Sequence, residues 1–156
     1  MTAEQEKHFI EEVGLLFDQL GLPRTAGRIM GWLLVCEPPH QTMDELTEAL
    51  GVSKSAISTT IRMLIQVRLV ERISLPGERK DHYRISDDAW TNAWNARMAQ
   101  VTVMRQLAER GLNLLPEENL ARRQRLETMR DMYAFFEREL PLLLTRWVAE
   151  QREKKG

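Results

Sequence analysis

The chain has 156 residues, 43% of them hydrophobic, and a formal net charge of −1 at pH 7. That length and apolar content suit one small domain with extensions and exclude a wholly disordered chain. No apolar run of about 18 residues is present, so we expect no membrane span. A start without a secretory-signal pattern and a single cysteine, Cys36, predict a cytoplasmic location and no internal disulfide.

Glycine and proline divide the first half of the chain into four predicted helices. Apolar residues at helical spacing predict helices over 2–20 and 23–36, the first stopped by a glycine and the second followed by two prolines. The capping box TMDE, residues 42–45, opens a short third helix that ends at Gly51. A fourth helix follows over 54–67.

Two strands and a tight turn come next. Residues 69–73 and 82–85 alternate with period two and predict a β-hairpin. A Pro-Gly pair marks the turn between them. Arg79 and Lys80 place two positive charges at its tip.

Two long helices complete the chain. An Asp-Asp pair caps a helix that runs to about Leu114, and Pro116 opens the last one. Apolar residues of the last helix recur at steps of three and four, which predicts a heptad seam that needs a partner helix. The seam comprises Leu126, Met129, Tyr133, Phe136, Leu140, Leu143 and Trp147. We expect a homodimer to bury it, with a helix hairpin inside one chain as the alternative. Pro141 predicts a kink or break.

The fourth predicted helix, within the stretch GVSKSAISTTIRML, has an unusual outer face. If its isoleucines and Leu64 point inward, the outer face consists of Lys54, Ser55, Ser58, Thr59 and Arg62. Ser and Thr are mediocre helix formers because their hydroxyls compete for the backbone. Short hydroxylated side chains nevertheless let a helix lie deep in the DNA major groove and bond phosphates or base edges. An ordinary polar surface helix is the alternative.

Positive charge is concentrated in the same region of the sequence. Residues 51–86 hold seven Lys/Arg and three Asp/Glu, a local net charge of +4, whereas the remainder has a net charge of −5. A basic patch on an acidic body is typical of a DNA-binding protein. Chance clustering on a solvated face is the alternative.

The order of helix, short helix, tight turn, helix and basic hairpin predicts a mainly α fold with a small β-hairpin wing, the winged helix-turn-helix. The stretch TMDELTEALGVSKSAISTTIRMLIQVRLVERISLPGERKDHYRIS resembles the MarR superfamily of bacterial transcription regulators. The preceding EEVGLLFDQLGLPRTAGRIMGWLLVCEPP is similar to its GbsR-like branch. The resemblance implies a homodimer whose first and last helices interlock and whose two heads read a pseudo-palindromic operator in double-stranded DNA.

The same resemblance implies a set of site residues. The DNA-binding residues would be Ser53, Lys54, Ser55, Ser58, Thr59 and Arg62 on the recognition helix and Arg79 on the wing, where Lys80 adds a second charge. We divide the chain into an N-terminal dimerisation helix (1–22), a DNA-binding domain (23–86) and a C-terminal dimerisation region (87–156). The expected dimer interface comprises Phe9, Val13, Phe17, Tyr133, Phe136, Leu140, Leu143 and Trp147.

Members of this family often sense a small molecule, and the GbsR-like branch includes choline-responsive repressors. A quaternary ammonium ligand requires an aromatic cage. The candidates are Trp32, Tyr83, Trp90 and Trp94, for which ordinary core packing is the alternative. Cys36 follows a helix beside an acid, so a buried inert thiol is favoured over a redox sensor.

Enzymatic chemistry has little support in the sequence. The three histidines, His8, His40 and His82, are far apart and have no metal-ligand spacing, and no phosphate-binding loop is present. We expect no enzyme and no cofactor. Arg24 and Arg28 either contact the DNA backbone or lie on an ordinary surface. The predicted function is a sequence-specific DNA-binding regulator, acting as a repressor. The alternative is a winged-helix module that docks a protein, although such a face should be apolar or aromatic.

Overall fold

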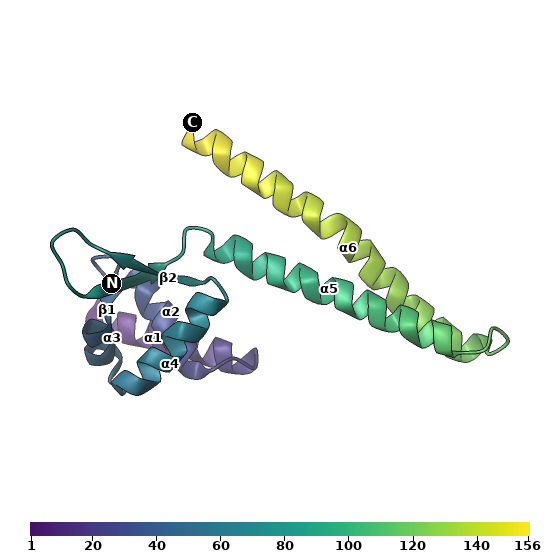
Figure 1. Cartoon of the computed structure of the whole chain (residues 1–156), viewed down its shortest axis with the longest axis horizontal. Helices are drawn as coiled ribbons and strands as arrows, with labels where there is room; N and C mark the ends of the chain where they lie inside the picture. The colour runs from purple at the N-terminus through teal and green to yellow at the C-terminus, as the bar shows by residue number, and fades with distance from the viewer. The chain divides into compact units, whose positions relative to one another are not determined.

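A computed structural model describes residues 1–156 and divides them into two units (Figure 1). Residues Met1–Asn92 form the first unit, here called the head, and residues Ala93–Gly156 form the second, here called the hairpin. The mainly helical fold with a small antiparallel sheet confirms the predicted fold class. No helix is long and apolar enough to cross a membrane.

The four predicted helices of the head are all present. They are α1 (Ala3–Gln19), α2 (Arg24–Val35), α3 (Met43–Leu50) and α4 (Lys54–Gln66). Threonine side chains form complete capping boxes at the starts of α1 and α3, since each accepts from the third helical backbone N–H while the third side chain bonds back. Gly51 ends α3 with φ of 61°, a left-handed conformation that favours glycine.

The core of the head lies between α2, α3, α4 and the sheet. Its largest fully buried side chains are Ile29, Met30, Leu46, Ile57, Ile61, Leu64 and Val70. Helix α1 covers this core through α2, and the contact is close because glycines line it. A Cβ placed on Gly27 would lie 2.5 Å from the Val13 carbonyl oxygen, and one on Gly31 would lie 3.1 Å from Cα of Ile10.

The head contains a three-stranded sheet rather than a simple hairpin. Strands β2 (Val70–Ser74) and β3 (Asp81–Ile85) pair antiparallel as the sequence predicts. A short strand β1 (Gln41–Thr42) adds to the other edge of β3, giving the order β1-β3-β2. The sequence analysis did not predict β1, because two residues carry no alternating pattern. Its pairing places the start of α3 beside the wing.

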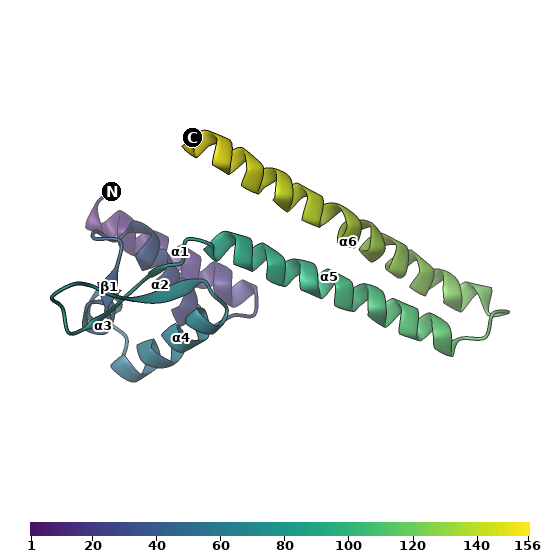
Figure 2. The same ribbon diagram turned by 45° about the horizontal axis from the view of Figure 1, so that its top comes forward.

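The hairpin unit consists of most of α5 (Ala89–Leu114) and of α6 (Leu120–Lys155). Figures 1 and 2 show α5 and α6 closest near the turn that joins them and separating toward the C-terminus. Near the turn, Leu126 lies over Gly111. The Arg123 guanidinium donates to the carbonyls of Leu112 and Leu115, both at 3.1 Å. The intrachain alternative therefore holds for the start of the seam, whereas Phe136, Leu143 and Trp147 further along α6 remain exposed.

Pro141 does not break α6, which is continuous from Leu120 to Lys155. Its missing N–H removes one helical hydrogen bond, to Glu137, but the helix extends for several turns on both sides. The same turn is also tied to α5. The Glu137 carboxylate binds the Arg105 guanidinium and accepts from the Thr102 hydroxyl at 3.1 Å. A break at Pro141 is therefore wrong, whereas the kink that the sequence also allows stays a prediction.

Candidate nucleic-acid interface

Helix α4 separates an apolar face from a polar one, as the sequence predicts. Ile57, Ile61 and Leu64 are buried in the head. The Ser53 hydroxyl caps the helix by accepting from the Ala56 N–H at 3.3 Å. The predicted contact residues of α4 are exposed or half-exposed, namely Lys54, Ser55, Ser58, Thr59 and Arg62. The structure therefore brings them together on one face.

Three of these side chains form no hydrogen bond or ion pair within the chain. They are Ser58, Thr59 and Arg62, whereas the neighbouring Thr60 hydroxyl donates to the carbonyl of Ala56 at 2.7 Å. Ser55 lies 3.3 Å from the Ser53 hydroxyl. Polar groups without an internal partner are available to an external one. The free hydroxyls and the free guanidinium thus lie together in the middle of the outer face of α4.

The turn before α4 is held from behind by Arg28. Its Nη2 donates to the carbonyl of Leu50, the last residue of α3, at 2.9 Å. Its Nε donates to Glu11 of α1 at 2.7 Å, and the Glu11 carboxylate also binds Arg24 at 2.8 Å. Hydrogen bonding to Arg24 and the charge of Arg28 lower the pKa of Glu11. Both arginines, considered above for DNA backbone contact, are paired with Glu11 of α1, and Arg28 also bonds the helix-turn-helix turn.

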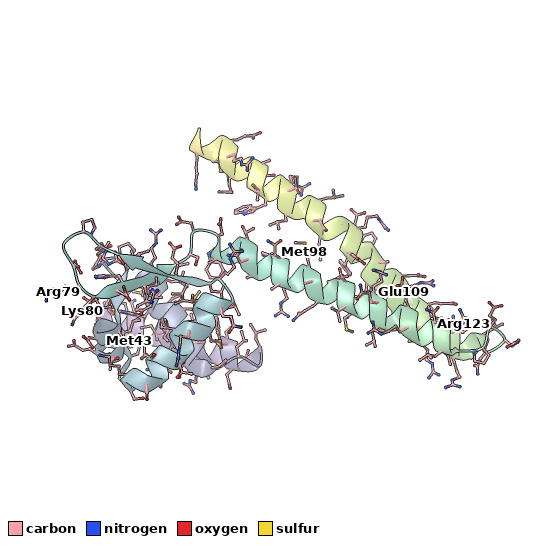
Figure 3. All side chains as sticks on the ribbon, viewed as in Figure 1. Met43, Arg79, Lys80, Met98, Glu109 and Arg123 are labelled. Carbon is pink, nitrogen blue, oxygen red and sulfur yellow. The ribbon has the colours of Figure 1, made fainter.

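The wing presents one free and one paired cation. Gly77, with φ of 81°, makes the turn between β2 and β3. Figure 3 labels Arg79 and Lys80 in the loop after it. Arg79 is exposed and has no ion-pair partner in the chain. Lys80 Nζ binds Oδ2 of Asp44 at 2.7 Å.

The arginines on the wing strands are already neutralised. Arg84 binds Glu71 at 2.5 Å across the two strands, and Arg72 lies 3.7 Å from Asp81. Part of the local positive charge counted from the sequence is therefore compensated inside the fold. The exposed cations of this region that form no ion pair within the chain are Arg62 on α4, Arg68 just after it and Arg79 at the wing tip.

His82 lies at the base of the wing, but its ring is buried. Its Nδ1 lies 3.1 Å from Nδ1 of His40, and its Nε2 contacts the Glu78 carboxylate in the wing loop. These contacts tie the wing loop to the chain before β1. No group of three or more His, Cys, Asp or Glu side chains is arranged to hold a metal ion.

The four predicted cage aromatics do not gather at one site in the head. Tyr83 is buried in the core, and Trp32 packs against the core while its Nε1 donates to Gln41 at 3.1 Å. Trp90 is exposed at the start of α5. Trp94 belongs to the hairpin and lines an apolar groove of about 820 Å³ between α5 and α6. Tyr133 and Leu140, two predicted interface residues, line the same groove.

The other predicted interface residues differ in how much surface they leave free. In the head, Val13 and Phe17 pack against the core of the same chain, and Phe9 is half-buried. On α6, Phe136, Leu143 and Trp147 are exposed by 37%, 50% and 52%. Among the predicted interface residues, the most exposed ones therefore lie on the hairpin.

Comparisons with known proteins place the chain in a family. A model described as an MmpR5-like MarR family transcriptional regulator matches residues 88–151, and a MarR family model matches residues 20–81. The HTH-type transcriptional regulator MmpR5 of Mycobacterium tuberculosis is 38% identical over 138 residues, which cover 88% of this chain and 84% of that protein. The chain belongs to the MarR family of winged-helix transcription regulators.

Other relatives agree with this membership. A crystal structure of a transcriptional regulator is 36% identical, covers 93% of this chain and 99% of its own, and has a TM-score of 0.77. The HTH-type transcriptional repressor OpcR of Bacillus subtilis is 35% identical over 83 residues, which cover 53% of this chain and 44% of OpcR. The MarR family is one of DNA-binding regulators and not of enzymes. Its winged helix corresponds here to α3, α4 and the wing.

Proposed function

We propose that this MarR family regulator reads double-stranded DNA with the outer face of α4 and anchors itself with the wing. The observation that carries the proposal is the exposed face of α4, where free hydroxyls surround the free guanidinium of Arg62. A helix of this kind fits the major groove, and Arg62 has the fork geometry that recognises guanine.

The remaining cations supply attraction to phosphates. Lys54 lies in the first turn of α4, where backbone N–H groups also favour an anion. Arg79 and Lys80 project from the wing and suit an adjacent minor groove or its phosphates. Ser53, Ser55, Ser58 and Thr59 contribute hydroxyls to phosphates or base edges.

We also propose a homodimer built through the hairpin. The support is the apolar surface that α5 and α6 leave exposed, including Phe136, Leu143 and Trp147 together with the groove lined by Tyr133 and Leu140. The exposed apolar side chains on α1 and at its C-cap are Leu15, Leu16 and Leu20, beside the predicted Phe9, Val13 and Phe17. A dimer would read half-sites roughly 34 Å apart, one turn of the DNA helix.

The residue ranges then receive roles within the dimer. Residues 1–22 and 87–156 would hold the two copies together, and residues 23–86 would bind DNA. A small effector would act by changing the spacing between the two DNA-binding heads of the dimer. Of the four aromatic candidates Trp32, Tyr83, Trp90 and Trp94, the groove favours Trp94, because Trp32 and Tyr83 already belong to the head core.

Three finer assignments complete the proposal. Repression is the proposed outcome of binding, since a dimer on its operator blocks access of RNA polymerase. Membership in the GbsR-like branch rests on the resemblance of residues 11–39. A cytoplasmic location is proposed because a bacterial transcription regulator acts on chromosomal DNA.

The decisive experiment is a selection of duplexes from a random DNA library, followed by fluorescence anisotropy at two salt concentrations with competitor DNA. We expect an enriched pseudo-palindrome and binding that weakens steeply with salt through counterion release. If no duplex is enriched and binding does not respond to salt, α4 does not read DNA. The winged-helix protein-docking module would then be the better description.

A further inference from the structure

Asp44 occupies a position that joins three elements of the head. It is the second residue of α3, two positions after the capping threonine Thr42. Because β1 pairs with β3, with Thr42 opposite His82, the first turn of α3 lies beside the wing. The first turn of α4 approaches the same place from the other side of the helix-turn-helix.

The Asp44 carboxylate binds two lysines from different elements. Its Oδ1 lies 3.1 Å from Nζ of Lys54 on α4, and its Oδ2 lies 2.7 Å from Nζ of Lys80 in the wing. All three side chains are accessible, with exposed fractions of 51% for Asp44, 68% for Lys54 and 67% for Lys80. This arrangement, here called the Asp44 bridge, is the direct link between recognition helix and wing tip.

The pair of Asp44 and Lys80 favours its charged form. Hydrogen bonds from Lys80 and then Lys54 lower the pKa of Asp44, and the bond to Asp44 raises the pKa of Lys80. Both lysines are predicted phosphate contacts, so the carboxylate and the DNA backbone compete for the same ammonium groups. Arg62 and Arg79 have no such internal partner.

A flexible lysine can follow a phosphate over several ångströms, and that adaptability favours every duplex alike. Lysines held on one carboxylate are less adaptable. Moving the two lysines away from Asp44 costs free energy. A duplex offsets this cost only where its phosphates lie within reach of α4 and of the wing at the same time. Specificity commonly includes such a cost imposed on the wrong partner.

We propose that Asp44 is a specificity-determining residue, which raises the discrimination between operator and other DNA by holding Lys54 and Lys80 in one spatial relation and competing for their charge. The proposal rests on the DNA-binding function proposed above. Asp44 is a positioning residue and does not itself contact DNA.

The test compares Asp44→Asn with two controls. Glu48→Gln removes an equal charge from an exposed position of the same helix, where the acid has no ion pair. Asp44→Glu keeps the charge and moves the carboxylate. The probes are a duplex selected by the wild-type protein and a shuffled duplex of equal composition, with affinities measured by anisotropy across a salt series. Melting temperatures establish that each variant is folded.

For Asp44→Asn we expect the affinity for the shuffled duplex to rise about threefold to fivefold, the scale of one exposed ion pair. The affinity for the selected duplex should change less, so the ratio of the two falls. Glu48→Gln should raise both affinities equally and leave the ratio unchanged, and Asp44→Glu should lie between Asp44→Asn and the wild type. If Asp44→Asn raised the affinity for both duplexes equally, Asp44 would act only through its contribution to the net charge. That result would overturn the proposal.

A measurement without DNA tests the Asp44 bridge independently of the proposed DNA-binding function. Titration of the Lys80 side chain by ¹³C NMR should show a pKa that falls toward 10.5 in Asp44→Asn and stays raised in Glu48→Gln. An unchanged Lys80 titration would mean that the Asp44 bridge is absent in solution and would overturn the proposal whatever the DNA result. A wild-type protein that prefers no duplex would instead overturn the proposed function, with the bridge still visible by NMR.

Discussion

Arg62 is the single free cation on the hydroxylated face of α4, and it lies one helical turn beyond Ser58. Replacing it by alanine removes both the charge and the donor fork. If Arg62 reads a base, Arg62→Ala should weaken binding to the selected duplex by about 1–3 kcal/mol and weaken binding to shuffled DNA much less. Anisotropy titrations give both numbers. Arg110→Ala, which removes an exposed arginine without a partner from α5, is the matched control. Equal losses on both duplexes would make Arg62 a phosphate contact.

Cys36 shows at the same scale how burial decides chemistry. Its side chain belongs to the head core, and desolvation, with Glu37 adding to it, raises its pKa to about 11. The thiolate is the reactive form, so at pH 7 to 8 almost none is present. We expect the native protein to react with a disulfide reagent far more slowly than the protein in denaturant, and the rate to keep rising with pH beyond pH 9. Rapid reaction of folded protein at pH 7 would restore the redox-sensor interpretation.

Between elements, the closest contact is that of α1 with α2. A methyl group on Gly27 would press on backbone atoms of Val13 and Gly14, at 2.5 and 2.8 Å, and backbone cannot move aside easily. Although alanine is the better helix former, Gly27→Ala should destabilise the protein by roughly 1–3 kcal/mol in urea denaturation. Gly111→Ala is the matched control, because its methyl would meet only the movable end of Leu126. It should be near neutral or stabilising, and equal losses in the two variants would mean that α1 does not pack as described.

The wing acts as an element rather than as single residues. Arg79→Ala combined with Lys80→Ala removes both charges at its tip and leaves the strand pairing of β2 and β3 intact. We expect the slope of log affinity against log salt to become shallower by about one to two units, since each lost phosphate contact contributes roughly one. An unchanged slope at reduced or equal affinity would exclude the wing from the DNA interface.

The elements differ in how well sequence alone specified them. Capping boxes, helical periodicity and the Pro-Gly turn are local signals, and they located α3, α4 and the wing to within about two residues. Once the apolar residues of α4 are assigned to its buried face, helical spacing identifies the residues of its outer face. The strand β1, the link from Arg28 to Leu50 and the Asp44 bridge depend on residues distant in sequence. No spacing rule predicts such pairs, because the whole head must fold before they meet.

The molecule as a whole poses the question of what covers the hairpin. On α6 no side chain is fully buried, although the helix carries a heptad pattern with Leu143 and Trp147 about half exposed. Monomeric proteins rarely leave so continuous an apolar surface to water. The start of the pattern is covered by α5 near Gly111, which explains why the sequence alone could not separate an internal hairpin from a dimer. The internal hairpin accounts for the start of the apolar pattern on α6, and a dimer would account for the rest.

A pair of charge substitutions distinguishes the dimer from an isolated chain. Leu140→Asp and Leu143→Asp, made singly, place a carboxylate in the apolar surface, and burying an unpaired charge at a subunit contact is strongly unfavourable. Light scattering should give the mass of two chains for the wild type and of one folded chain, or of unfolded protein, for the variants. Leu120→Asp, at an exposed position by the turn of the same helix, should leave the dimer intact.

The monomeric variants should also lose most affinity for a two-half-site duplex, because one head alone makes half the contacts. A stable dimer in both variants would move the interface off this part of α6 and leave α1, with its exposed leucines, as the surface to substitute next.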